Sequence, residues 1–166
     1  MNFLIACHKL QLYRKPQVRP ITALCNWREE IKQRTDAAQV NLLWSISDLD
    51  DTCFLSPRQR INLDRILRES ITNILKHAHP HAISICLNEQ SDKLQIIITD
   101  DGISTDSSQW QANTGLYSLK TRAEEIAAKL SWDSGGDSSS FEKGTQLTIT
   151  LPELEKIPYA LNTHCR

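Results

Sequence analysis

Three segments of the chain carry apolar residues at the spacing of one helical face. They cover residues 21–36, 57–78 and 115–130, and each has polar residues on its other side. The apolar positions are Leu24, Trp27 and Ile31 in the first segment, Leu63, Leu67, Ile71, Ile74, Leu75 and Ala78 in the second, and Leu116, Leu119, Ala123, Ile126, Ala127 and Leu130 in the third. We therefore predict three amphipathic helices.

The second helix has the clearest ends. Ser56 is a good N-cap, and Pro57 suits the first helical position, where its missing N–H has no partner to lose. Pro80 favours an end near Ala78, because a proline disfavours helical geometry in the residue before it.

Other segments have the length and apolar content of strands. They are 39–47, 82–88, 93–99 and 146–152. Residues 89–92 connect the middle two as a hairpin, and we expect the Ser-, Gly- and Asp-rich stretch 131–143 to hold a short strand and a loose turn. Helices and hairpins in this order predict an α+β fold, since a parallel doubly wound fold would alternate more strictly.

Composition narrows the class of protein. The chain has 166 residues with 19 basic and 20 acidic side chains, so its net charge of -1 provides no basic surface for nonspecific nucleic-acid binding. No apolar run approaches the ~20 residues that cross a bilayer, and the five cysteines form no CxxC or Cys/His cluster. We expect a cytoplasmic chain with reduced thiols and no direct membrane contact, whether whole or part of a membrane-anchored protein.

A polar stripe runs along the second helix. It consists of Glu69, Asn73, Lys76 and His77, which share one side at 100° per residue. Periodicity alone favours a solvated helix face for this stripe. The three histidines between His77 and His81 have the composition of a metal site, but a helix ending at a proline-containing turn is the favoured interpretation.

Three short motifs carry further candidate chemistry. Asp100 and Gly102 follow the strand 93–99, where a carboxylate can face a pocket. Gly115 begins the third helix, and free N–H groups at a helix N-terminus bind anions such as phosphate. Gly144 and Thr145 open the last strand. Each motif alone is also typical of an ordinary turn or helix start.

Taken together, these motifs resemble the ATP-binding domain of sensor histidine kinases. That domain belongs to the gyrase/histidine-kinase/MutL (GHKL) superfamily, which has the Bergerat fold. RESITNILKHA (68–78) is similar to the asparagine box, LQIIITDDG (94–102) to the first glycine box, GLYSLKTRAEEIAAKL (115–130) to the second, and GTQLTITLP (144–152) to the closing strand. The nitrate/nitrite-sensor subgroup is the most similar. The resemblance implies a two-layer sandwich, with a mixed sheet of about five strands covered on one face by about three helices.

The resemblance also implies roles for the polar stripe. Asn73 matches the residue that ligates Mg²⁺ beside the ATP phosphates, and oxygen ligands suit this ion. Glu69 matches a catalytic acidic residue that positions water or acts as a base. Lys76 matches a basic residue that reaches the phosphates, and His77 occupies an ATP-binding position without a defined role.

The glycine boxes imply the remaining ATP contacts. Asp100 matches the carboxylate that accepts a hydrogen bond from the adenine amino group, and Thr145 matches a threonine that supports it. Gly102 and Gly115 match glycines that let the backbone approach the nucleotide. We also expect Leu116, which follows Gly115 in the second box, to be an ATP-binding residue.

A function follows from the resemblance. It implies the catalytic domain of a two-component histidine kinase, which transfers the ATP γ-phosphate to a histidine on a separate dimerisation domain, for relay to a response regulator. His8 lacks the acidic neighbour of a phosphoacceptor motif. We therefore expect a catalytic fragment, with a connecting segment at 1–20, the ATP-binding domain at 21–152 and a C-terminal tail at 153–166.

Two alternatives remain open. Ser104 and Asn113 stand where the boxes usually have glycine, and Ser118 stands where a small glycine is frequent. These changes favour a degenerate, non-catalytic GHKL module that serves interaction. The other alternative is an anti-sigma-factor-type serine kinase of the same superfamily, which the motif details fit less well.

Overall fold

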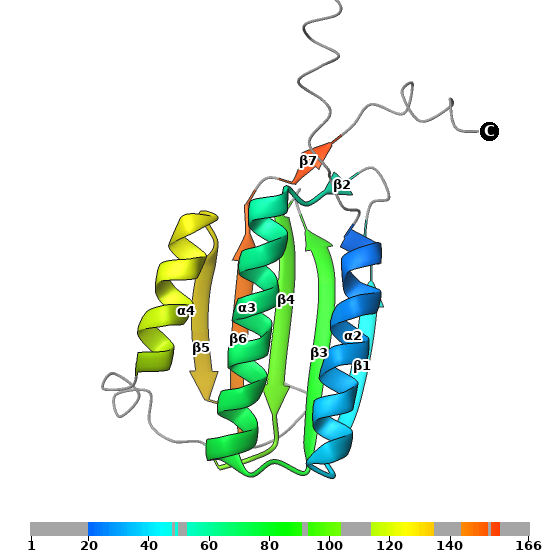
Figure 1. Ribbon diagram of the computed structural model, residues 1–166, viewed down its shortest axis with the longest axis vertical. Coiled ribbons are helices and arrows are strands. Elements are labelled where there is room, and N and C mark those ends of the chain that lie inside the picture. Colours follow the sequence, from blue (N-terminus) through cyan, green and yellow to red (C-terminus); the bar gives the residue numbers. More distant parts are fainter. Residues whose placement is uncertain are drawn as a thin grey trace, which may run out of the picture.

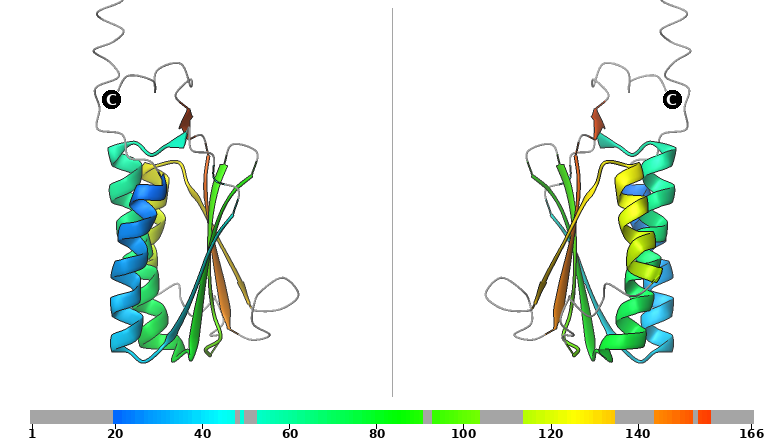
Figure 2. Two further views of the ribbon diagram at one scale, coloured as in Figure 1. Left: turned by 90° about the vertical axis from the view of Figure 1, so that its right-hand side faces the viewer. Right: turned by 90° about the vertical axis from the view of Figure 1, so that its left-hand side faces the viewer.

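A layer of three helices covers one face of a five-stranded sheet in the described part of the chain (Figures 1 and 2). The computed structural model describes residues 20–47, 49, 53–90, 93–103, 114–134, 144–152 and 154–156. The helices are α2 (Pro20–Ala37), α3 (Pro57–Asn73) and α4 (Thr114–Glu125). This arrangement confirms the predicted two-layer α+β fold.

The sheet is mixed, with the strand order β1-β3-β4-β6-β5. Its strands are β1 (Asn41–Ser47), β3 (Ala82–Gln90), β4 (Lys93–Asp100), β5 (Lys129–Ser134) and β6 (Thr145–Leu151). β1 pairs with β3 in parallel, whereas the other neighbours are antiparallel. Both predicted hairpins, β3–β4 and β5–β6, are therefore confirmed.

The core lies between the helices and the sheet. Along β4, Leu94, Ile96 and Ile98 are buried against the helices, while the intervening residues face the other side and are half-buried. A strand points successive side chains to opposite faces, so three apolar residues at alternate positions suffice to place β4 in the core. The buried face of α3 and the predicted face of α2 complete it: Leu63, Ile66, Leu67 and Ile71 from α3, and Leu24, Trp27 and Ile31 from α2.

The long helix begins as predicted but changes geometry near its end. Ser56 forms a capping box, in which its hydroxyl accepts from the Gln59 N–H (3.2 Å) and the Gln59 side chain accepts from the Ser56 N–H (2.8 Å). The α-helix stops at Asn73 and continues as a π-helical turn, η1 (Ile74–Ala78). His79, in a left-handed conformation with φ of 48°, ends it.

The predicted extent of the third helix, 115–130, is wrong at its C-terminal end. α4 ends at Glu125, and Leu130 lies in β5 instead. Ala127 has a φ of 54°, and the Ala128 N–H donates to the Ala123 carbonyl (2.8 Å). This is a Schellman-type helix end. A glycine usually marks such an end in a sequence, and alanine at Ala127 conceals it.

The expected tail also contributes to the fold. No structure was predicted beyond Glu153, yet β7 (Glu155–Lys156) pairs antiparallel with β2 (Cys53–Phe54), just before α3. Two-residue strands carry no periodic signal, so only their long-range pairing identifies them. Leu154 is 7% exposed and belongs to the core.

Neighbouring isoleucines of β4 provide a test of this layering. We expect Ile96→Ala to lower the free energy of unfolding by about 2–5 kcal/mol, because it leaves a cavity between sheet and helices. Ile97→Ala removes the same atoms from the half-buried outer face and should cost clearly less. Urea unfolding of both variants measures the difference, and equal losses would contradict the assigned faces.

Candidate functional site

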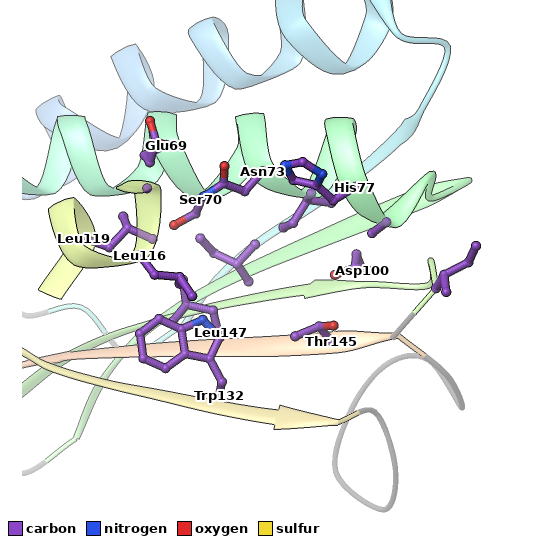
Figure 3. Close-up of a pocket in the computed structure, with 15 residues that line it drawn as sticks. Glu69, Ser70, Asn73, His77, Asp100, Leu116, Leu119, Trp132, Thr145 and Leu147 are labelled. Atoms are coloured by element: carbon purple, nitrogen blue, oxygen red, sulfur yellow. The ribbon is translucent and has the colours of Figure 1, made fainter. Parts of the chain in front are cut away.

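A pocket of about 450 Å³ lies where α3, η1 and α4 meet the ends of three strands (Figure 3). The helical layer contributes Glu69, Ser70, Asn73, Ile74, His77, Ala78, Gly115, Leu116 and Leu119. The sheet and the residues after β4 contribute Ile98, Asp100, Ile103, Trp132, Thr145 and Leu147. Segments far apart in the sequence thus form one cavity, with polar groups from α3, η1, the end of β4 and the start of β6.

Three residues of the polar stripe line this pocket: Glu69 and Asn73 of α3, and His77 of η1. Glu69 and Asn73 are half-buried, so the favoured interpretation of a solvated face is wrong for these two, whereas His77 is exposed as well as lining the pocket. Lys76 is exposed and lies outside the lining. The π-helical turn begins directly after Asn73, so the last residues of the stripe do not follow ideal α-helical angles.

Asp100 is the most buried charged group of the pocket, with 1% of its surface exposed. Its Oδ1 accepts from the Gly102 N–H (2.9 Å), and the Thr145 N–H also donates to its carboxyl group. Its Oδ2 is buried and has no hydrogen-bond partner among the described residues. Burial raises the pKa of this carboxyl, and the two N–H donors oppose that rise only in part. An unpaired buried acceptor in a cavity is suited to a ligand N–H.

The loop that holds Asp100 is fastened at two points. Asp101 Oδ1 accepts from the N–H groups of His81 (2.8 Å) and Ala82 (2.9 Å), at the start of β3. The Ile103 N–H donates to the Ala78 carbonyl (2.8 Å), at the end of η1. These bonds position the carboxylate relative to the polar stripe. Asp101 was not among the predicted site residues, because an aspartate before a glycine is common in turns.

Glycine is required sterically on both sides of Asp100. A Cβ on Gly102 would lie 2.3 Å from the Ala78 oxygen, so Gly102 permits the approach of the loop to η1 although it does not line the pocket. Gly144 has a φ of 110°, and a Cβ there would lie 1.8 Å from the backbone carbonyl oxygen of Asp100. Gly144 was seen in the sequence as part of a strand start and was not counted as a site residue.

The first turn of α4 closes the pocket against the stripe. A Cβ on Gly115 would lie 2.8 Å from Glu69 Oε1 and 3.4 Å from Asn73 Nδ2. Leu116, also predicted, lines the cavity beside it. The N-terminus of α4 therefore lies next to the carboxylate of Glu69 and the carboxamide of Asn73.

The apolar side of the pocket was not predicted from the sequence. It includes Ile74, Ile98, Leu119, Trp132 and Leu147. Strand alternation could have placed Ile98 and Leu147 on the inner face next to Asp100 and Thr145. Trp132 carried no such signal, because the limits of its strand were not recognised.

Two other sequence features concern metal binding and membrane crossing. Among the described residues, no group of three or more His, Cys, Asp or Glu side chains is arranged to hold a metal ion, including the histidines that follow His77. In the same part of the chain, no helix is both long and apolar enough to cross a membrane.

Comparisons with known proteins identify the family of this chain. The family described as "Histidine kinase-, DNA gyrase B-, and HSP90-like ATPase" matches residues 58–155, more than half of the chain. The signal transduction histidine-protein kinase/phosphatase UhpB of Salmonella typhimurium is 30% identical over 111 residues, covering 65% of this chain and 21% of that protein. The sensor histidine kinase YvfT of Bacillus subtilis is 28% identical over 116 residues, covering 70% and 29%.

A solved structure has the same fold. The mycobacterial sensor histidine kinase MprB superposes with a TM-score of 0.65 at 15% identity, over 86% of this chain and 99% of that one. The shared fold thus extends over nearly all of that solved chain, whereas this chain spans less than a third of the length of the curated relatives named above.

The raised pKa of Asp100 predicts a pH dependence of stability. Below its ordinary value of 3.8 the carboxyl is protonated in both states; at higher pH the folded chain retains a proton that the unfolded chain releases. The free energy of unfolding therefore loses a contribution as pH rises through the folded-state pKa. We expect the stability of Asp100→Asn relative to wild type to increase between about pH 4 and about pH 7, measured by urea unfolding.

The same substitution at exposed Asp133 corrects for the general effect of removing one carboxylate. A stability difference for Asp100→Asn that stays constant or falls over this range, after that correction, would contradict the cost of burying the charge.

Proposed function

Because this chain belongs to the histidine kinase-, DNA gyrase B- and HSP90-like ATPase family, we propose that it is the ATP-binding catalytic domain of a two-component sensor histidine kinase. It would bind ATP and transfer the γ-phosphate to a histidine of a separate dimerisation domain. The observation that carries the proposal is the unpaired, buried Oδ2 of Asp100, which shares one pocket with Asn73 and Glu69. The superfamily and the fold that the sequence predicted are confirmed, whereas the nitrate/nitrite-sensor subgroup stays a prediction.

The base would bind at the sheet end of the pocket. The Gly102 N–H already uses Oδ1 of Asp100, so Oδ2 is the acceptor left for the amino group of adenine. Guanine has a carbonyl oxygen at the corresponding position, and two acceptors facing each other in a buried site are unfavourable. Thr145, whose N–H holds the carboxyl group, supports this contact from β6.

The phosphates would lie between α3 and the N-terminus of α4. Backbone N–H groups at a helix start and the positive end of its dipole favour anions, and Gly115 keeps this turn close to Asn73. The carboxamide oxygen of Asn73 is a ligand type that Mg²⁺ accepts, and Mg²⁺ on the phosphates would neutralise part of their charge. Lys76, exposed beside the pocket, would reach the phosphates from outside.

Catalysis would consist mainly of positioning and charge stabilisation, as is general for phosphoryl transfer. Asp100 and Thr145 would hold the base, Asn73 and Gly115 the phosphate chain. Glu69 lies one helical turn before Asn73 and borders the same cavity, so its carboxylate can orient the attacking group or take its proton.

The wider setting is part of the proposal. We assign residues 21–152 to the ATP-binding domain, 1–20 to a connecting segment and 153–166 to a C-terminal tail that begins with β7 pairing. The phosphoacceptor domain and a response regulator would be its partners in the parent protein. The proposed location is cytoplasmic, including the cytoplasmic part of a membrane-anchored sensor.

The alternatives are less well supported by the pocket. A degenerate interaction module rested on Ser104 and Asn113, which lie outside the described residues. A lost ligand at Asn73 or Asp100 would have favoured it, and both residues are in the cavity. Nothing in the described geometry favours the anti-sigma-factor-type serine kinase over the histidine kinase.

Nucleotide titration tests the proposal. We expect the wild-type chain to bind ATP with a Mg²⁺-dependent affinity in calorimetry, and to bind GTP far more weakly. Asn73→Ala should abolish the Mg²⁺ dependence while leaving the chain folded. Asn41→Ala, at an exposed position of β1 outside the pocket lining, is the matched control and should bind like wild type.

Asp100→Asn should weaken ATP binding by about 1–3 kcal/mol, the cost of leaving a buried hydrogen-bonding group without a partner. The Gly102 N–H requires an oxygen, so the new amide nitrogen would face the adenine amino group as a second donor. Equal affinity for ATP and GTP, or an unchanged Asn73→Ala variant, would refute the assigned site.

A further inference from the structure

Trp132 is a large aromatic side chain at the floor of the pocket, on the side away from α3. It lies on β5 and pairs with Leu147 of β6, which pairs in turn with Ile98 of β4. This pairing places the three residues in a row across the sheet, and all three line the pocket. Figure 3 shows Trp132 and Leu147 in the lining. The indole is half-buried, so part of its surface is available to a ligand.

The surroundings of Trp132 restrict its orientation. Leu116 and Leu119 of α4 line the same side of the cavity. The Nζ of Lys120 lies over the ring, 6.0 Å from its centroid, at the distance of a cation–π contact. A ring held between α4 and the sheet is a preorganised surface, which loses little conformational freedom on binding.

The sheet register places Trp132 at a suitable distance from Asp100. Asp100 follows Thr99, which pairs with Gln146, and Trp132 lies two strands away and two residues deeper. Strands are about 4.8 Å apart and rise about 3.3 Å per residue, so the two Cα atoms are separated by roughly 12 Å. Aspartate and indole side chains that point into the cavity from these positions leave room for a planar ring of purine size between them.

We propose that Trp132 is a base-contacting residue that determines affinity for the purine of the bound nucleotide. Asp100 would select the base by its amino group, and Trp132 would contribute apolar and aromatic contact to the ring. This inference rests on the proposed ATP site and adds to it a residue for which no role was assigned. The proposed contact predicts that Trp132 raises the affinity only of ligands that carry a base.

The test combines affinity with fluorescence. We expect Trp132→Ala and Trp132→Leu to bind ATP about 5- to 100-fold more weakly, the range found when an aromatic side chain under a base is removed. Affinity for inorganic tripolyphosphate with Mg²⁺, which has no base, should not change. In wild type, ATP should alter tryptophan emission, and Trp132→Phe should abolish that change while keeping most of the affinity.

Trp44→Phe is the matched control, because Trp44 is a half-buried tryptophan on β1, outside the pocket lining. It should retain both the affinity and the emission change. If wild type binds ATP but the Trp132 variants bind it equally well, or lose tripolyphosphate affinity to the same extent, this inference is overturned and the ATP site stands. If folded wild type binds no ATP, the proposed function fails and the inference with it.

Discussion

The burial of the Asp100 carboxylate is the constraint around which the site is arranged. A charge removed from water is costly unless it is paired, and here the Gly102 N–H donates to Oδ1 while Oδ2 has no partner among the described residues. The fold accepts that cost at a position where β4, β6 and η1 converge. Glycine is needed at Gly102 and Gly144, because a side chain at either position would collide with the backbone oxygen of Ala78 or of Asp100. A ligand donor would complete the hydrogen bonding that the protein leaves open.

The π-helical turn η1 connects this buried carboxylate to the polar stripe. It directly follows Asn73, and its last carbonyl, that of Ala78, accepts the Ile103 N–H just beyond Asp100. π-Helical turns are rare, and those that do occur are often found at functional sites. Here the turn lies between Asn73 and the loop that follows Asp100. The sheet below contributes the apolar residues Ile98, Trp132 and Leu147 to the same pocket.

Local sequence signals predicted the elements better than their ends. The N-cap at Ser56 and the strand at 93–99 depend on neighbouring residues, and both appear as predicted. The early end of α4 depends on a left-handed alanine, Ala127, whose conformation is stabilised by bonds back into the helix. The β2–β7 pairing joins residues about a hundred positions apart, so no local pattern reveals it.

The sequence by itself determined the layer architecture and the chemical identity of the polar site. Periodicity specified which faces are apolar, and the spacing of Glu69, Asn73, Asp100 and Thr145 carried the family resemblance. Only the tertiary structure decided which of these residues meet. Folding placed Lys76 outside the pocket lining and brought Trp132 and Leu119 into it. It also placed the Asp101 carboxylate where it accepts hydrogen bonds from the backbone at the start of β3. The physical reason is that side chains become neighbours through strand pairing and helix packing, which join segments with no local relation in the sequence.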